Sequence, residues 1–363
     1  MASITVEQVE NVLKSVEDEY TGGNLVSDKT VKEIRVDGNQ VSIEVVLSYP
    51  AKTIAETLAV KITDSVKGLE GVGDVDVAIS SKIEAHSVQK SLTRMENIKN
   101  VIAVASGKGG VGKSTTAVNL ALALAADGAT VGVLDADIYG PSQPRMLGIS
   151  GQPESSDGKS LEPMENHGVQ AMSIGFLIDE ETPMIWRGPM VTQALEQLLN
   201  DTRWRELDYL IVDLPPGTGD VQLTLAQKIP VSGAVIVTTP QDIALLDARK
   251  GLKMFEKVEV PVLGIVENMS IHICSECGHE EAIFGTGGGE AMAKESDVDL
   301  LGKLPLDMSI RMQVDGGEPS VVADPQGRVA EIYGDIARKM AAKLGSKSKD
   351  YSAKFPKIVI QNN

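Results

Sequence analysis

Aromatic residues, cysteines and long hydrophobic runs are all scarce in this chain of 363 residues. Aromatic side chains make up only 3% of it, and no apolar run approaches the roughly 20 residues of a membrane helix. The N-terminus, Met1 to Glu7, lacks the basic start and apolar core of a signal peptide. The sequence therefore predicts a cytoplasmic protein without a membrane span.

Basic residues are also few relative to acidic ones. The chain has 34 Lys and Arg against 51 Asp and Glu, a formal net charge of −17. Nucleic acids and anionic membranes carry the same sign of charge, so this balance disfavours nonspecific binding to either. We expect neither nucleic acid nor a membrane among the partners.

A glycine-rich stretch fits the phosphate-binding pattern G-x-x-x-x-G-K-[ST]. It follows the apolar run 101–105 and precedes a helical pattern that stops at Gly128. In this order, backbone N–H groups and a helix N-terminus surround phosphate oxygens. Lys113 would reach the β- and γ-phosphates of ATP, and the Ser114 hydroxyl would bind Mg²⁺. The predicted nucleotide-binding residues here are Gly107, Lys108, Gly109, Gly110, Val111, Gly112, Lys113, Ser114 and Thr115.

Strand-like runs then alternate with helical patterns, which predicts an α/β fold with a mostly parallel sheet. The runs are 101–105, 130–134, 209–212, 234–238, 262–266 and 300–304. Ligands in such folds bind beyond the carboxyl ends of the strands. Asp213 closes one run and is the predicted carboxylate near Mg²⁺. Asp135 and Asp137 follow another, and Asp135 either joins this site or only caps the following turn.

The first 85 residues read as a separate small α+β module. The apolar pattern predicts a helix with one face from Val9 to Tyr20, strands at 31–36 and 41–47 around an Asp37-Gly38 turn, a helix at 54–66 and a strand at 72–79. The module lacks a catalytic set of residues, so a partner-binding or scaffold role is expected. A partly helical linker is predicted at 86–99, within the polar stretch 82–100, then the nucleotide-binding domain at 100–345 and a tail at 346–363.

The phosphate-binding loop carries a second lysine, Lys108, which an ordinary loop does not need. The form GKGGVGKS resembles the deviant Walker A loop of the Min and Par partitioning proteins, nitrogenase iron protein and the arsenite pump ATPase. This resemblance implies a homodimer in which Lys108 reaches the partner's nucleotide. The alternative interpretation is that Lys108 is a solvated surface lysine. It also implies that Asp137 orients the attacking water, so Lys108, Lys113 and Asp137 are the candidate catalytic residues. Residues 213–220 resemble the second switch loop of that group.

The two cysteines, Cys274 and Cys277, are too few for a disulfide scaffold and too close together to look incidental. Their thiolates can ligate one soft metal centre, but a four-coordinate site needs two more ligands. A dimer would supply four thiolates around one shared iron–sulfur cluster. Three alternatives remain: a zinc ion shared by the dimer, a zinc site completed by His272 and His279 within one subunit, and a dithiol redox pair.

Several longer motifs resemble the Mrp/ApbC family of P-loop iron–sulfur cluster carriers over roughly residues 100–325. Besides the phosphate-binding loop and the cysteine pair, they are DADIYGPSQPRMLG (135–148), IWRGPM (185–190), DYLIVDLPPGTGD (208–220), TTPQ (238–241), GIVENMS (264–270) and GKLPLDMSIR (302–311). The resemblance implies a P-loop NTPase domain that binds a cluster, expected to be 4Fe–4S, at a dimer interface. It also implies ATP hydrolysis and transfer of the cluster to apo iron–sulfur proteins.

Two residue-level expectations follow from this family. Asn268 lies where related ATPases contact adenine, although it could equally cap its own loop. The N-terminal module resembles a metal–sulfur-assembly domain that frequently carries a cysteine near its second helix. The segment Tyr49-Pro50-Ala51-Lys52 has none, which puts cluster handling by this module in doubt.

A partitioning or positioning ATPase of the Min/Par type is the competing function. Such proteins rely on a basic patch or an amphipathic basic helix. The tail from Lys343 holds scattered lysines, Pro356 and a strand-like run at 357–360, which does not read as a membrane helix. A zinc-bridged regulatory ATPase is the third interpretation.

Overall fold

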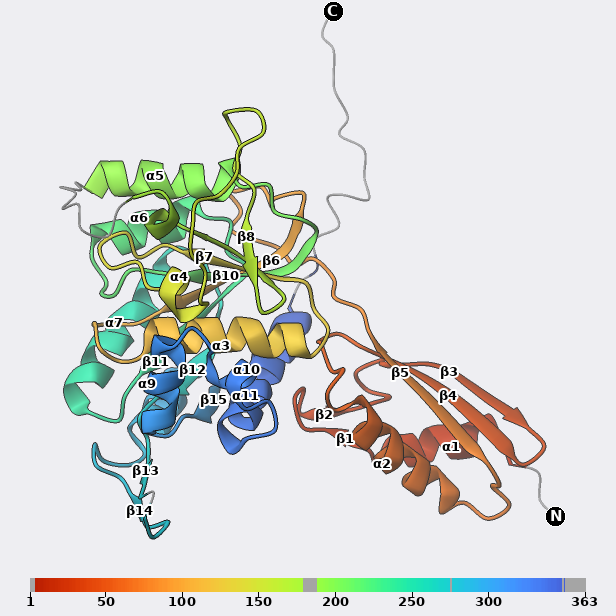
Figure 1. The fold of residues 1–363 in the computed structure, drawn as a ribbon. Coiled ribbons are helices and arrows are strands. Elements are labelled where there is room, and N and C mark those ends of the chain that lie inside the picture. Colours follow the sequence, from red (N-terminus) through yellow and green to blue (C-terminus); the bar gives the residue numbers. More distant parts are fainter. Residues whose placement is uncertain (1–3, 179–187, 275, 348, 350–363) are drawn as a thin grey trace, which may run out of the picture.

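The computed structural model describes residues 4–178, 188–274, 276–347 and 349 (Figure 1). Residues 185–187 of the IWRGPM motif and nearly all of the predicted tail lie outside this part. Two bodies are visible. A small N-terminal module is built from α1 (Val6–Leu13), β1 (Glu17–Asp18), β2 (Gly23–Asn24), β3 (Val31–Asp37), β4 (Gln40–Leu47), α2 (Ala55–Lys67) and β5 (Val75–Ser81).

The larger body is organised around an eight-stranded sheet. Its strands, in spatial order, are β15 (Leu300–Lys303), β12 (Val262–Glu267), β11 (Gly233–Thr238), β6 (Ile98–Ala105), β10 (Leu207–Asp213), β7 (Val131–Asp135), β9 (Val169–Ser173) and β8 (Met164–Asn166). All neighbouring pairs are parallel except β8 with β9. The predicted α/β class with a mostly parallel sheet is confirmed, and each of the six predicted runs is a strand.

Helices cover both faces of this sheet. One face carries α3 (Lys113–Ala126), α10 (Ser320–Ala323) and α11 (Arg328–Gly345), and α11 packs along α3. The other carries α5 (Gly188–Asp201), α6 (Asp220–Lys228), α7 (Asp242–Lys257) and α8 (Gly288–Glu295), in contact one after another. This division follows from the right-handed crossovers between parallel strands. The crossover that contains α3 and the crossovers that contain α6 and α7 run in opposite directions along the sheet, so these helices lie on opposite faces. Short helices α4 (Gln143–Met146) and α9 (Met308–Asp315) lie near the P-loop end of α3 (Figure 1).

The sheet is buried because it is covered on both faces. β10 and β11 are apolar along almost their whole length, as expected of central parallel strands. The two residues at their carboxyl ends that break the pattern are Asp213 and Thr238, both buried. A charged side chain buried at the end of a central strand needs local partners, and this identifies the edge where the site should be sought.

The N-terminal module differs from the prediction at its first helix. β3, β4 and β5 form a three-stranded sheet, and α2 matches the expected helix. The predicted helical face from Val9 to Tyr20 is wrong beyond Leu13, where α1 ends. Ser15 turns the chain by bonding Val12 O through its hydroxyl at 2.6 Å. Tyr20 is thereby free to leave the module's core and contact the larger body.

The predicted partly helical linker is also wrong in the described residues, since positions 82–97 contain no helix. This segment is irregular, with turns at 90–91 and 96–97, and is held by Gln89, a buried side chain. Its amide nitrogen donates to Ala226 O at 2.7 Å, and its carbonyl accepts from Val231 N at 3.0 Å. These bonds serve backbone groups at the end of α6, so tertiary contacts rather than local propensity decide the conformation. The boundaries 1–85, 86–99, 100–345 and 346–363 stay a proposed division.

Arg338 of α11 joins the module to the larger body. Its guanidinium donates to Asp127 at 2.8 Å and to Asp335 at 2.7 Å, and it lies 5.1 Å from the centre of the Tyr20 ring. Asp127, the residue that ends α3, also accepts from Thr53 N of the module at 2.9 Å. The side chains of Arg338 and Asp127 are 6% and 2% exposed. One buried ion pair of the larger body, between α11 and the end of α3, therefore binds Thr53 and Tyr20 of the module.

We expect Arg338→Met to destabilise the protein by about 3–5 kcal/mol, because it leaves the Asp127 carboxylate buried without its cation. Urea denaturation followed by circular dichroism measures the loss. Arg311→Met is the matched control: Arg311 pairs with Asp315 on α9, and both side chains are at least half exposed. That change should cost about 0–1 kcal/mol. Equal losses in the two variants would contradict a role for the buried pair.

Candidate nucleotide site and cysteine hairpin

The P-loop connects β6 to α3 and needs glycine at two positions for different reasons. Gly112 has φ of +82°, and a Cβ there would lie 2.2 Å from Asn268 Nδ2. Gly107 faces α7, where a Cβ would lie 2.1 Å from the Asp247 carbonyl carbon. Glycine at these positions lets the loop pass close to Asn268 and α7, and a glycine-rich loop of this kind leaves its N–H groups free to face phosphate. The local geometry is that of a phosphate-binding loop.

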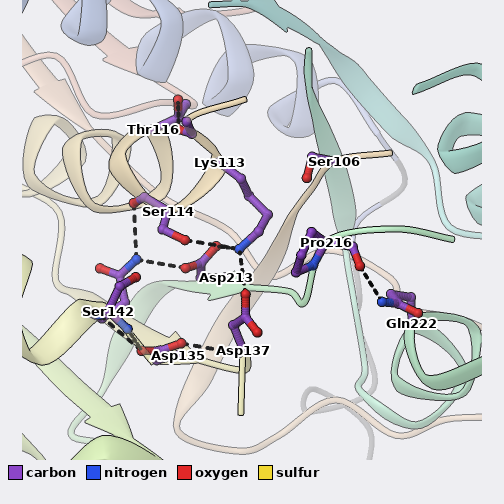
Figure 2. A network of polar contacts seen from close by, with 12 residues as sticks. Ser106, Lys113, Ser114, Thr116, Asp135, Asp137, Ser142, Asp213, Pro216 and Gln222 are labelled. Atoms are coloured by element: carbon purple, nitrogen blue, oxygen red, sulfur yellow. Dashed lines mark hydrogen bonds and ion pairs between the residues drawn. The ribbon is translucent and has the colours of Figure 1, made fainter. Parts of the chain in front are cut away.

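Lys113, the first residue of α3, points into a cluster of the predicted site residues (Figure 2). Its ammonium forms an ion pair with Asp213 and lies 3.1 Å from Ser114 Oγ. Asp137 Oδ2 lies 3.9 Å from the same nitrogen. Four residues proposed from the sequence thus meet at the carboxyl edge of the sheet. The site therefore has one cation, the Lys113 ammonium, between two carboxylates at the carboxyl ends of β10 and β7.

Asp135 is fully buried and holds the loop that follows β7. Burial, and next the nearby Asp213 carboxylate, raise the pKa of Asp135 to about 7. Its carboxylate accepts hydrogen bonds at 3.0–3.2 Å from the backbone N–H groups of Asp137, Ser142 and Gln143 and the hydroxyl of Ser173. The alternative that Asp135 caps the following turn is therefore confirmed. Burial also raises the pKa of Asp137, and Lys113 opposes that shift.

Asn268, just after β12, contacts the P-loop directly. Its amide nitrogen donates to Val111 O at 2.9 Å, and its carbonyl accepts from Met269 N at 2.9 Å. The second bond is the loop cap considered from the sequence, while the first fixes Asn268 beside the P-loop. An adenine contact remains a proposal.

Lys108 and the second switch segment flank the P-loop. Lys108 is half-buried, its carbonyl accepts from Ser106 Oγ at 2.9 Å, and within the described chain its ammonium has no ion pair. Gly217 of the segment 213–220 donates to Ser106 O at 2.9 Å. The segment resembling a switch loop is thus bonded to the strand end from which the P-loop starts.

The oxygen donors around Lys113 suit a hard divalent cation. The Ser114 hydroxyl and the carboxylates of Asp213 and Asp137 converge on one ammonium group, and Mg²⁺ prefers such oxygens together with phosphate. Because the Lys113 ammonium is paired with the Asp213 carboxylate here, phosphate must attract the lysine away before the carboxylate can coordinate a metal. When bound, Mg²⁺ would neutralise charge on the phosphates.

The two cysteines lie on a small hairpin that projects from the larger body (Figure 1). The hairpin is formed by β13 (His272–Ile273) and β14 (Glu280–Glu281). Cys274 N donates to His279 O and Gly278 N donates to Cys274 O, both at 2.9 Å. Cys274 is partly exposed and Cys277 is exposed. Hydrogen bonds from the backbone of Cys277 and then Glu276 lower the pKa of the Cys274 thiol, which favours the thiolate that binds metals.

The hairpin does not complete a metal site within one chain. Across the described ranges, no group of three or more His, Cys, Asp and Glu side chains is arranged to hold a metal ion. His272 instead lies 3.2 Å from Leu306 O through Nδ1, and His279 is exposed. This geometry counts against the zinc site within one subunit.

A short path connects the nucleotide site to the hairpin. Cys274 follows Asn268 by six residues. Between them, Ser270 N donates to Leu304 O at 3.0 Å, and Ile271 O accepts from Leu306 N at 2.9 Å. These bonds hold the segment between Asn268 and Cys274 against residues 304–306.

Gln143 is the residue of this site that sequence reasoning missed. Its side chain is buried between the P-loop helix and β10, and it bonds both Ser114 and Asp213. It stands within the quoted motif 135–148. The sequence pattern does not predict a buried role for an amide in a segment so rich in turn residues, because turn segments commonly carry polar side chains at the surface.

No helix within the described ranges is both long enough and apolar enough to cross a bilayer.

Comparisons with known proteins agree with this geometry. The family model of the NUBPL iron-transfer P-loop NTPase matches residues 97–341, and that of an iron–sulfur cluster assembly protein matches residues 6–79. The iron-sulfur cluster carrier protein of Haemophilus influenzae is 50% identical over 93% of this chain and 91% of its own length.

Two solved structures are also similar to this chain. A nucleotide-binding protein from Archaeoglobus fulgidus in complex with ADP is 38% identical, with a TM-score of 0.57 over 64% of this chain and 91% of that one. The cell division ATPase MinD of Pyrococcus furiosus, at 22% identity and a TM-score of 0.51 over 66% of this chain and 97% of its own, shares the fold alone. With most of its length matched by one family model and by a relative of this identity, the chain belongs to the family of NUBPL-type iron-transfer P-loop NTPases.

Proposed function

We propose that this protein binds an iron–sulfur cluster and delivers it to apo iron–sulfur proteins, using ATP binding and hydrolysis. The observation that carries the proposal is the exposed Cys274–Cys277 hairpin, bonded through a short segment to a residue that contacts the P-loop. Exposure matters because a cargo must be reachable by its recipient. The names of the relatives in the family support the same cargo.

We further propose that two copies share one 4Fe–4S cluster. Two thiolates supply only half of the four protein ligands that such a cluster needs, and the described residues form no group of three or more His, Cys, Asp and Glu side chains that could hold a metal ion. A second hairpin related by a two-fold axis supplies the remaining thiolates. Lys108 supports the same dimer for two reasons. Its ammonium has no ion pair within the described part of the protomer, and it directly follows the first glycine of the P-loop.

The chemistry proposed at the nucleotide site is hydrolysis of ATP with Mg²⁺. Lys113 would pair with the β- and γ-phosphates instead of Asp213, and Ser114 and Asp213 are the residues that would hold the metal. Asp137, held beside Lys113 by the loop that Asp135 anchors, orients the attacking water. Lys108 of one copy would neutralise charge on the phosphoryl group bound to the other copy. The P-loop residues from Gly107 to Thr115 supply the phosphate cradle.

Coupling between the two sites would pass through Asn268. If adenine or the P-loop shifts Asn268 on binding, the segment to Cys274 moves with it. Coupling of this kind is reciprocal, so cluster loading must change nucleotide affinity by the same factor that nucleotide changes cluster affinity. The proposed place of this activity is the cytoplasm.

A partitioning ATPase of the Min/Par type has less support. MinD shares the fold at 22% identity, and the net charge of −17 is unfavourable for DNA or anionic lipid. A zinc ion bridging two hairpins uses the same four thiolates, so the geometry does not separate it from a cluster. Metal analysis after anaerobic purification does.

Anaerobic reconstitution with iron and sulfide tests the proposal. We expect about four iron and four sulfide per dimer, with a charge-transfer absorption band, and transfer of the cluster to an apo-ferredoxin. A protein that stays monomeric, or a dimer that retains zinc and excludes iron, would contradict it. Liposome and DNA pelleting in the presence of ATP tests the partitioning alternative, and we expect no pelleting in either assay.

A further inference from the structure

Gln143 occupies an unusual position in the nucleotide site. It is the first residue of α4, and its side chain is 1% exposed. The segment around it lies between α3, which starts at the P-loop, and β9. An amide buried this deeply is costly unless its polar atoms find partners, so its hydrogen bonds show what it does.

The amide nitrogen of Gln143 donates two hydrogen bonds. One goes to Ser114 O at 3.1 Å, and the other to Asp213 Oδ2 at 2.9 Å. Both acceptors are oxygens, so the reverse orientation of the amide would set its own oxygen against a carbonyl and a carboxylate. The orientation is therefore fixed by chemistry. The side chain ties the second residue of α3 to the last residue of β10.

The two oxygens of Asp213 thus have different partners. Oδ1 is held by Lys113, and Oδ2 is held by Gln143. When phosphate draws Lys113 away, Gln143 still holds the carboxylate in place. Because an amide is neutral, it fixes Asp213 without cancelling the negative charge that attracts a divalent cation. A lysine or arginine at this position would remove that charge.

The other polar atom of Gln143 has no partner in the part of the chain that the structure describes. Gln143 Oε1 is buried and accepts no hydrogen bond from the described residues. A buried acceptor of this kind beside a charged site normally receives a hydrogen from a water or a ligand. Because this unpaired oxygen lies next to Asp213 and Ser114, Gln143 differs from a buried amide whose only role is packing.

We propose that Gln143 is a positioning residue for Mg²⁺-bound nucleotide, acting through the Asp213 carboxylate. The proposal rests on the nucleotide site of the proposed function. It predicts a selective effect: loss of the amide weakens nucleotide binding in the presence of Mg²⁺ and leaves Mg²⁺-free binding almost unchanged. A side chain that only supports the fold would affect both equally.

The test is calorimetric titration of ADP into the full-length protein, with Mg²⁺ and with EDTA. For Gln143→Met, which keeps the length and removes the hydrogen bonds, we expect about tenfold weaker binding with Mg²⁺. Without Mg²⁺ the affinity should stay within about twofold of wild type. Gln170→Met is the matched control. Gln170 of β9 is an amide with bonds to Arg205 O at 3.1 Å and from Arg205 N at 3.0 Å, outside the site, and both of its affinities should stay unchanged.

A second variant keeps the proposal falsifiable if Gln143→Met fails to fold. Gln143→Asn retains an amide but is one methylene too short to reach both acceptors, and it should show the same selective loss. Unchanged Mg²⁺-dependent affinity, or an equal loss with and without Mg²⁺, would overturn the proposal. Failure of the proposed function is a different result, because a missing nucleotide site would leave the wild-type protein unable to bind ADP, and a missing cluster site would show only in the reconstitution experiment.

Discussion

Replacing Cys274 or Cys277 by alanine will remove the iron–sulfur cluster from the reconstituted protein. Each subunit would then offer one thiolate, so a dimer would retain two ligands of the four that a cluster requires. We expect iron and sulfide to fall to background and cluster transfer to an apo-acceptor to cease. ADP binding by these variants should stay within about threefold of that of the cluster-free wild type, because neither thiol belongs to the P-loop.

Two histidine variants serve as the controls for this experiment. His272→Ala and His279→Ala remove the side chains that could complete a zinc site near the cysteines, and neither should change the iron content. If His279→Ala abolishes metal binding while the protein stays monomeric, the shared cluster is wrong and a zinc site within one subunit replaces it. If one cysteine variant keeps a full cluster, the ligand set must come from elsewhere.

Mixing two inactive lysine variants will restore ATP hydrolysis. Lys113→Met and Lys108→Met should each lower the rate by at least about 10²-fold, because each loses a cation at the transferring phosphoryl group. In a mixed dimer, the nucleotide bound to the Lys108→Met chain has its own Lys113 and receives Lys108 from the partner. Random mixing makes half of the dimers mixed, with one intact site of two, so about a quarter of the wild-type rate returns.

The outcome decides whether Lys108 acts in its own subunit or in the other one. If both lysines serve the same chain, no mixture contains an intact site and the rate stays at the level of the single variants. Lys250→Met is the control. Lys250 of α7 is mostly exposed and pairs with Asp247 at 2.9 Å, so this variant should keep the wild-type rate alone and in mixtures.

The sequence was most informative where a buried strand meets a polar residue. The apolar runs predicted six of the eight strands of the large sheet, and the parallel arrangement followed from their alternation with helices. Asp213, Asp137 and Lys113 could be expected to meet because the carboxyl ends of parallel strands share one edge. β9 was missed because Val169–Ser173 is short and carries Gln170 as its second residue.

The errors arose where contacts between distant segments override local pattern. Tyr20 has helical spacing from Val9, yet it reaches Asp335 of α11, which lies 315 positions away. Gln89 lies in a polar stretch that reads as a linker, but its amide is committed to backbone groups of the larger body. Gln143 was overlooked for the same reason, since its acceptors belong to α3 and β10 rather than to its own turn.

The attachment of the N-terminal module has a consequence for truncation experiments. α3 carries the proposed phosphate-binding residues Lys113 and Ser114 at its start and ends beside Asp127, about 20 Å away along the axis. Cutting the chain before residue 97 would remove Thr53 and Tyr20 and open the Arg338–Asp127 pair to solvent. An isolated fragment that lacks the module would thus hold the end of α3 less firmly, and nucleotide binding measured on that fragment would not represent the intact chain.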